Sequence, residues 1–204
     1  MSPKLEELAD EELVRRFNDG ESRAFEILLQ RYRRPLYNFV LRSVRNQDRA
    51  DELIQDVFLK IVQKSSDFKG NSKFSTWMYT IARNLCIDNS RKMVFRRHRS
   101  LDAPMRSDGE EGPSLLDRVA SDDPGVHRDA IAQDLRLKIA EAVEELPDDQ
   151  REVFLMRQLQ GMPFKAIADI VGVPENTVKS RMRYALERLQ RALCEYEDYV
   201  QELK

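Results

Sequence analysis

The chain has 204 residues, of which 41% are hydrophobic and 34% are charged, and its formal net charge is −2. This material is sufficient for one large domain or two small ones with compact apolar cores. No apolar run approaches the roughly 20 residues of a membrane helix, and the acidic, amphipathic N-terminus does not resemble a signal peptide, so we expect a soluble, cytoplasmic protein without direct membrane insertion.

Residues 1–94 have the apolar periodicity of helices and are expected to form one helical domain. Asp10 is placed to cap the first helix, and Gly20 is placed to end it. Pro35 lies inside the second helical pattern and should kink that helix. The four helices are expected at residues 10–17, 22–45, 48–64 and 74–94.

The third of these helices has two distinct sides. Its apolar side is expected to be buried and consists of Ala50, Leu53, Ile54, Val57, Phe58 and Ile61. Its polar side projects in the opposite direction and consists of Asp51, Glu52, Gln55 and Asp56. For an isolated helix, the simplest interpretation of this polar side is a solvated surface without a partner.

The fourth helix contains the chain's one Trp and begins after the loop Gly70–Lys73. Spacings of three and four define an inner stripe of Phe74, Trp77, Met78, Ile81 and Leu85. Trp77 is therefore expected to pack in the core rather than to stack on a base. The polar positions, which are candidates for contact with nucleic acid, are Asn71, Ser72, Lys73, Thr76, Thr80, Arg83, Asn84, Asp88 and Arg91.

The middle of the chain, residues 95–133, is rich in Ser, Asp, Gly and Pro, and it is expected to be a flexible linker. A basic run, residues 91–99, leads into this linker with five Arg or Lys residues and no acid. The expected fold class is therefore all-α, with two helical domains, 1–94 and 134–204, joined by this linker.

The second domain contains the most specific pattern in the chain, a predicted helix-turn-helix. A helix that Asp148 can cap is expected before Gly161. Gly172 suits the following turn, and Pro174 suits the start of the last helix, which would enter the major groove of DNA. The outward side of that helix carries Glu175, Asn176, Lys179, Ser180, Arg183 and Tyr184. Thr177 and the N-terminus of the helix are expected to hold a phosphate through backbone N–H groups. Arg181 and Arg188 add positive charge for phosphates. The alternative to a helix-turn-helix is a three-helix bundle with a solvated basic side.

These stretches, taken together, resemble a bacterial sigma factor of the sigma-70 family, within its small extracytoplasmic-function group. The resemblance rests on Ala50–Leu59, Gly70–Asn84 and Pro163–Leu193. It implies that the first domain is similar to region 2 and the second to region 4. It also implies that Asp51, Glu52, Gln55 and Asp56 dock on the clamp helices of the largest subunit of core RNA polymerase.

The same resemblance implies two contacts with promoter DNA. The loop Gly70–Lys73 and the start of the fourth helix would hold a base that is flipped out of the melted non-template strand at the −10 element, where the nearby cations attract phosphates. The last helix would read the −35 element as duplex, with base contacts from Lys179, Ser180, Arg183 and Tyr184. Members of this group are usually held inactive by an anti-sigma factor, which is a further expected partner.

An enzymatic function has little support in the sequence. The two histidines, His98 and His127, have no Cys or acid nearby at ligand spacing, and Cys86 and Cys194 match no metal-ligand spacing. We therefore expect no catalytic residue, no metal and no cofactor. Two other functions remain as alternatives: a stand-alone helix-turn-helix transcription regulator, and an interaction module that binds protein but not DNA.

Overall fold

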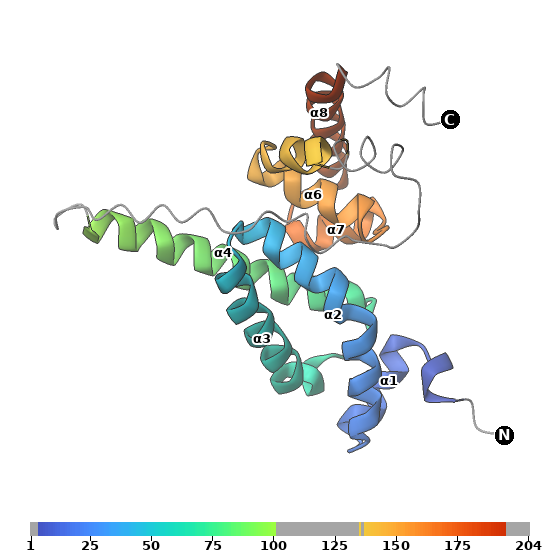
Figure 1. Cartoon of the computed structure of the whole chain (residues 1–204). Helices are drawn as coiled ribbons and strands as arrows, with labels where there is room; N and C mark the ends of the chain where they lie inside the picture. The colour runs from blue at the N-terminus through green and yellow to red at the C-terminus, as the bar shows by residue number, and fades with distance from the viewer. Residues whose placement is uncertain (1–3, 101–134, 136, 195–204) are drawn as a thin grey trace, which may run out of the picture. The chain divides into compact units, whose positions relative to one another are not determined.

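The computed structural model describes residues 4–100, 135 and 137–194, with the backbone alone for residues 94–100 (Figure 1). The regular elements in this part of the chain are all helices, so the all-α expectation is confirmed. Two short 3-10 helices are η1 (Leu5–Glu7) and η2 (Ser65–Asp67). The α-helices labelled in Figure 1 are α1 (Asp10–Asn18), α2 (Ser22–Val44), α3 (Gln47–Lys64), α4 (Phe74–Ser100), α6 (Asp148–Gln158), α7 (Phe164–Val171) and α8 (Glu175–Leu193).

Contacts between Cα atoms divide the chain into two compact units, residues 1–108 with 165–173, and residues 109–164 with 174–204. Most of α7 is thereby grouped with the first unit, although α7 follows α6 directly in the chain. The Arg157 guanidinium on α6 lies over the ring of Phe164, the first residue of α7, at 4.9 Å from the ring centroid. The domain boundaries expected from the sequence remain a prediction.

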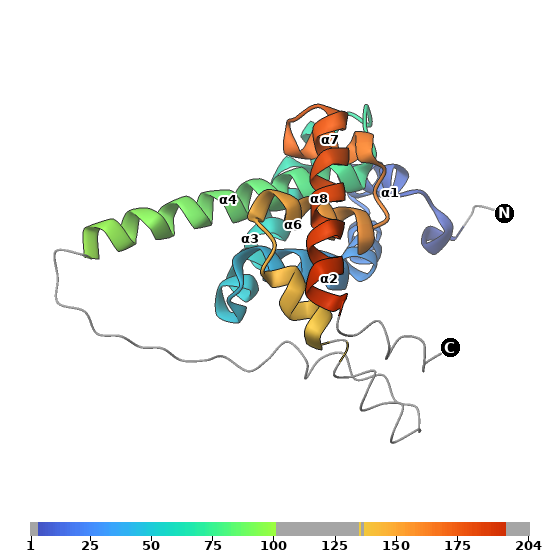
Figure 2. The ribbon, with the colours of Figure 1, turned by 90° about the horizontal axis from the view of Figure 1, so that it is seen from above.

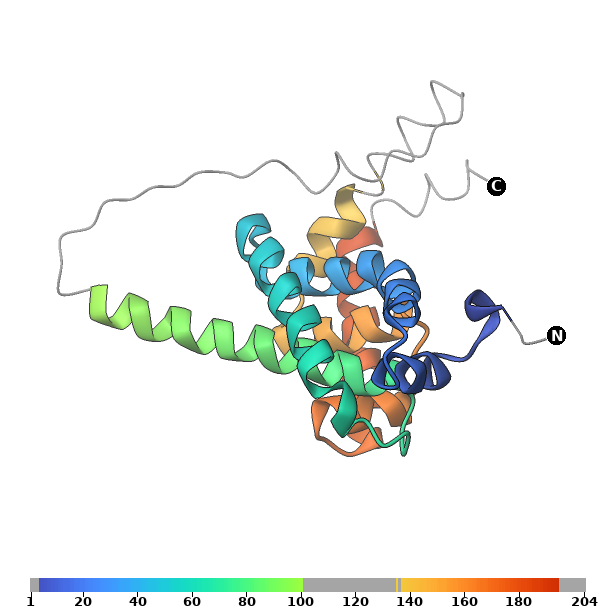
Figure 3. The ribbon, with the colours of Figure 1, turned by 90° about the horizontal axis from the view of Figure 1, so that it is seen from below.

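In the first unit, α2 packs against α1, α3 and α4, and α3 also packs against α4. The apolar stripes that the sequence predicts form this core, with Leu36, Phe39 and Val57 almost fully buried. The helices begin and end close to the expected residues, with one clear exception. Helix α4 continues to Ser100 rather than ending near Val94, and it extends past the other helices of its unit in three views (Figures 1, 2 and 3).

Two expected helix caps are wrong, because tertiary partners take the side chains. Asp10 is the first residue of α1, which has no side-chain cap, and its carboxylate instead binds Arg31 and Tyr32 on α2. Asp148 likewise begins α6 without capping it and pairs with Arg151. A side-chain cap is present at the start of α3, where the Asn46 side chain accepts a hydrogen bond from the Arg49 N–H at 3.0 Å.

Candidate nucleic-acid interface

Helix α3 presents a polar surface to solvent, as its sequence predicts. The exposed side chains are Asp51, Glu52, Gln55 and Asp56. The buried side chains of α3 are Ala50, Leu53, Val57 and Ile61. Ile54 and Phe58, which were expected to be buried, are only half-buried. The four polar groups therefore form one continuous side of a helix that its apolar side holds in place.

Two large apolar side chains extend this polar surface, and neither was expected from the sequence. Leu59 is 56% exposed and Val62 is 37% exposed. Positions 52, 55, 59 and 62 recur at spacings of three and four, so they share one side of the helix. Their exposure could have been predicted from the sequence, because Leu59 and Val62 fall outside the buried apolar stripe of α3. Acids beside exposed apolar groups suit a protein partner with basic and apolar side chains.

The loop between η2 and α4 is polar and exposed at Asn71, Ser72 and Lys73. Gly70 opens the loop with a φ of 71°, a left-handed conformation that glycine adopts at little cost. The loop is supported by Phe68, whose ring centroid lies 5.9 Å from that of Phe74 and 5.3 Å from that of Trp77.

Trp77, at the start of α4, is half-buried within this aromatic cluster, in agreement with the expectation that it packs rather than stands free. The exposed polar side chains of this region therefore lie on the loop and not on the tryptophan.

Along α4, the predicted polar positions differ in exposure. Asn84, Asp88 and Arg91 are exposed, whereas Thr80 and Arg83 are half-buried. Thr76 was expected at the surface, but it is only 9% exposed. The Thr80 hydroxyl donates a hydrogen bond to the Thr76 carbonyl at 2.8 Å, which ties it to the helix backbone. The accessible polar side of α4 therefore starts later than the sequence indicated.

The predicted helix-turn-helix segment folds locally as α7, a turn and α8. Gly172 in the turn has a φ of 75°, and its N–H donates to the Ala168 carbonyl at 2.8 Å. Pro174 precedes α8 and supplies the carbonyl that accepts from Thr177 N–H at 2.9 Å. The Thr177 N–H therefore already has a partner and is not free for a phosphate, contrary to the expectation from the sequence.

The predicted outward side of α8 is largely open to solvent. Asn176, Lys179, Ser180, Arg183 and Tyr184 are exposed, and Glu175 and Thr177 are half-buried. Four of the charged or aromatic groups already have neighbours on the same helix, in two pairs. The Lys179 ammonium lies 2.7 Å from the Glu175 carboxylate, and the Arg183 guanidinium lies over the Tyr184 ring at 4.9 Å. Such exposed pairs contribute at most about 1 kcal/mol, so DNA contacts could replace them.

Arg181 lies differently from the other cations of α8. Its side chain is 23% exposed and faces α6, with its Nε at 3.1 Å from the Asp149 carboxylate and its Nη1 at 3.8 Å from that of Glu152. Two acids thus neutralise a cation that was expected, from the sequence, to contact phosphates.

Arg151 on α6 is a second structural cation, and the sequence analysis did not identify it. It is 4% exposed and donates to the carbonyls of Leu146 at 3.0 Å and Glu144 at 3.2 Å. These bonds hold the turn that precedes α6.

Full or partial burial raises the pKa values of three side chains in the first unit. Burial raises the pKa of the Cys86 thiol to about 12. Burial also raises the pKa of Tyr79, whose hydroxyl has no hydrogen-bond partner among the described residues. The pKa of Tyr32 is raised by burial and by its hydrogen bond to Asp10.

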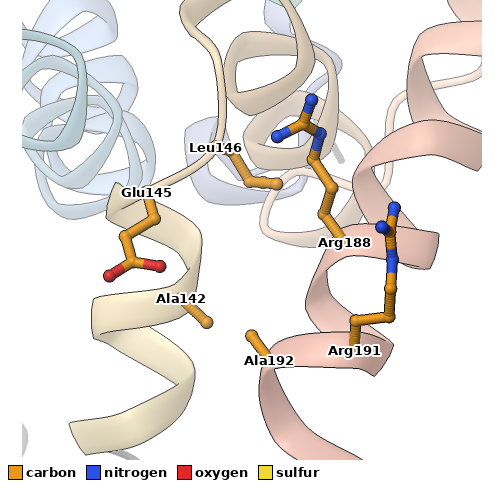
Figure 4. A pocket seen from close by; sticks show the side chains of 6 residues that line it. All are labelled: Ala142, Glu145, Leu146, Arg188, Arg191 and Ala192. Atoms are coloured by element: carbon orange, nitrogen blue, oxygen red, sulfur yellow. The ribbon is translucent and has the colours of Figure 1, made fainter.

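A shallow hollow of about 190 Å³ lies between the helix of residues 137–144 and the C-terminal part of α8. It is lined by Ala142, Glu145, Leu146, Arg188, Arg191 and Ala192. Figure 4 shows both guanidinium groups on α8, with the Glu145 carboxylate pointing away from them.

Residues 4–100, 135 and 137–194 contain no group of three or more His, Cys, Asp or Glu side chains placed to hold a metal ion. No helix among them combines the length and the apolar character needed to cross a bilayer. The side chains of His98 and His127 and the expected linker beyond residue 100 lie outside the described residues.

Comparison with protein families gives two matches on the chain. The description "Sigma-70 region 2" matches residues 28–96, and "Sigma-70, region 4" matches residues 136–189. The first match contains α3, the loop and most of α4, and the second contains α6, α7 and most of α8. Both predicted polar surfaces therefore lie within stretches that these families describe.

Two curated bacterial proteins are similar to nearly the whole chain. The RNA polymerase sigma-H factor of Pseudomonas aeruginosa is 29% identical over 187 residues, which cover 90% of this chain and 93% of the relative. The ECF RNA polymerase sigma-E factor of Escherichia coli strain K12 is 31% identical over 185 residues, which cover 90% of this chain and 94% of the relative.

Solved structures agree with these matches. The sigma factor RpoE of Bartonella quintana, in complex with the anti-sigma factor NepR, has a TM-score of 0.64 and 26% identity over 83% of this chain and 96% of that chain. CnrH in complex with the cytosolic domain of CnrY has a TM-score of 0.63 and 21% identity over 93% of this chain and 99% of that chain. The lower identity of the second structure limits it to evidence about the fold.

Proposed function

We propose specific roles for the surfaces of this chain, which belongs to the sigma-70 family and to its extracytoplasmic-function group. It is a sigma factor that binds core RNA polymerase and directs it to promoter DNA. The observation that carries this conclusion is that region 2 and region 4 both match the same chain, in that order. A stand-alone helix-turn-helix regulator would explain the second match but not the first, so that alternative is not favoured.

The α3 surface is our proposed site for core polymerase. Asp51, Glu52, Gln55 and Asp56 offer acidic and amide groups, and the exposed Leu59 adds an apolar contact. Complementary charge on the clamp helices of the largest polymerase subunit would speed docking and fix the register. The double variant Asp51→Ala, Gln55→Ala is expected to weaken binding to core polymerase, and Glu26→Ala, an exposed acid on α2, is the matched control.

The loop Gly70–Lys73 and the exposed side of α4 are our proposed site for the melted non-template strand of the −10 element. Asn71 and Asn84 can each donate and accept hydrogen bonds at a base edge, and Lys73 and Arg91 attract phosphates. The exchange of base stacking for protein–base contacts would supply free energy for melting. The polymerase would perform the chemistry, so we infer that this chain is not itself an enzyme.

The exposed side of α8 is our proposed reader of the −35 duplex. Lys179, Arg183 and Tyr184 are exposed on one helix that follows a helix-turn-helix turn. If Lys179 contacts a base, Lys179→Ala should cost about 1–3 kcal/mol on the preferred sequence and relax the preference at one position. A uniform loss across all sequences would instead identify a phosphate contact.

Regulation by an anti-sigma factor is a further part of the proposal. One similar solved structure is a sigma factor in complex with an anti-sigma factor. We also infer that this chain acts in the cytoplasm, because it is a partner of polymerase and its described part has no membrane-spanning helix. Affinity capture from the native host should therefore recover a second protein besides polymerase, and recovery of polymerase alone would contradict the regulation proposed here.

The experiment that tests the proposed function is run-off transcription with bacterial core polymerase and templates from the native genome. The intact chain should give specific starts that core polymerase alone does not give. The Asp51, Gln55 double variant should lose these starts while keeping its binding to −35 duplex. If the intact chain bound duplex DNA but never directed initiation, the stand-alone regulator would be the better description.

A further inference from the structure

Helix α1 makes two long-range side-chain contacts with the segment that joins α3 to α4. The Phe74 N–H, at the start of α4, donates to Glu11 Oε1 at 2.9 Å. The Asn18 amide donates to the Ser65 carbonyl, directly after α3, at 3.0 Å. The exposed loop Gly70–Lys73 lies between these two attachment points. One helix therefore holds both ends of the segment that carries the loop.

Glu11 has an electrostatic role at its attachment point. The first N–H groups of a helix lack intrahelical partners and carry partial positive charge, which favours an anion. In α4 the Glu11 carboxylate fills this position, so a DNA phosphate does not need to occupy it. The loop is thereby left to present its side chains to a base.

Helix α1 is itself fixed to α2, which allows it to act as a support. The Asp10 carboxylate binds the Arg31 guanidinium at 2.6 Å and accepts a hydrogen bond from the Tyr32 hydroxyl. The Tyr32 ring packs edge-on against the Phe74 ring at 5.7 Å between centroids. Neighbouring residues of α1 and α2 thus meet the start of α4 through both a hydrogen bond and a ring contact.

We infer that Glu11 and Asn18 are positioning residues for promoter melting, which hold the loop Gly70–Lys73 in the shape that accepts an unstacked base. This inference rests on the proposed role of the loop at the −10 element. Both residues lie outside residues 28–96, the stretch that the region 2 description matches. Their action is through the loop, without contact with DNA.

The test measures the binding of holoenzyme to a fluorescein-labelled single strand. The strand carries the non-template −10 sequence of a promoter from which the unaltered protein initiates. Glu11→Ala and Asn18→Ala should each weaken strand binding about three- to tenfold, as expected for loss of one hydrogen bond. Glu11→Gln should retain more affinity, because its amide oxygen can still accept. Glu12→Ala is the matched control, since Glu12 pairs only within α1 in the contacts described, with Arg15 and Arg16.

A double-mutant cycle with Asn71→Ala separates positioning from general damage. If Glu11 acts through the loop, Glu11→Ala should have little further effect once Asn71 is Ala. The inference would be overturned if the losses of strand binding in Glu11→Ala and Asn71→Ala were additive. It would also be overturned if Glu11→Gln lost as much strand binding as Glu11→Ala and both variants had an equally lowered unfolding temperature. Unchanged binding in Glu11→Ala when Asn71→Ala is impaired would likewise overturn it. If Asn71→Ala itself had no effect, the proposed role of the loop would fail instead.

Discussion

Arg181→Met distinguishes a structural cation from a DNA contact on the same helix. The sequence places Arg181 among the phosphate-binding cations of α8, but its guanidinium lies at 3.1 Å from Asp149 and 3.8 Å from Glu152 on α6. Removing the charge should therefore weaken the packing of α6 on α8, with little effect on affinity for DNA.

The magnitude follows from the exposure of the three groups. The side chains of Arg181 and Glu152 are 23% and 17% exposed, whereas that of Asp149 is 48% exposed. A fully exposed pair contributes at most about 1 kcal/mol, and this partly buried pair should contribute about 1–2 kcal/mol. Each 1 kcal/mol lowers Tm by roughly 4–8 °C in a small domain, so a decrease of about 5–15 °C is expected.

The assay combines a thermal melt with a salt titration of binding to −35 duplex. Arg188→Met is the matched control, because Arg188 is exposed on α8 and is also expected to lie near phosphates. Arg188→Met should reduce the magnitude of the slope of log K against log salt by about one, without loss of stability. Arg181→Met should lower Tm and leave that slope unchanged. The opposite result, a reduced slope with an unchanged Tm for Arg181→Met, would refute this reasoning.

Three further predictions concern buried groups. Arg151→Met should destabilise the packing around α6 by about 1–3 kcal/mol in urea unfolding, because the Leu146 carbonyl loses its donor; a variant as stable as the parent would mean that water replaces the guanidinium. Tyr79→Phe should raise the free energy of unfolding by about 1 kcal/mol, because it removes a buried hydroxyl that has no partner among the described residues. The measurement is the urea midpoint followed by Trp77 fluorescence, and a lower midpoint than that of the parent would show that this hydroxyl has a partner. Ellman's reagent should label only the exposed Cys194 in the folded protein, because burial raises the pKa of Cys86 to about 12 and keeps it a thiol. Both cysteines should react after unfolding. Rapid labelling of Cys86 in the native state would contradict its burial.

Much of the helical framework could be predicted from the sequence, because apolar spacing and turn residues act locally. The stripe around Leu53 and Val57 fixes which side of α3 faces outward, and Gly172 marks the turn before α8. These features depend on neighbours within a few residues, which the printed sequence displays directly.

The side-chain partners could not be predicted in the same way. Asp10 and Glu11 have the pattern of an ordinary acidic first turn, yet their partners are Arg31, Tyr32 and Phe74, far along the chain. Thr76 looks like a surface residue by type, but the packing of α4 buries it. Such outcomes depend on how the helices pack, and no local rule specifies the packing.

The unbroken length of α4 sets a distance within the molecule. Its 27 residues span about 40 Å at 1.5 Å per residue. At 3.4 Å per base step, this length corresponds to about 12 base pairs of duplex. The chain therefore leaves α4 at Ser100 a fixed distance from the loop that precedes Phe74.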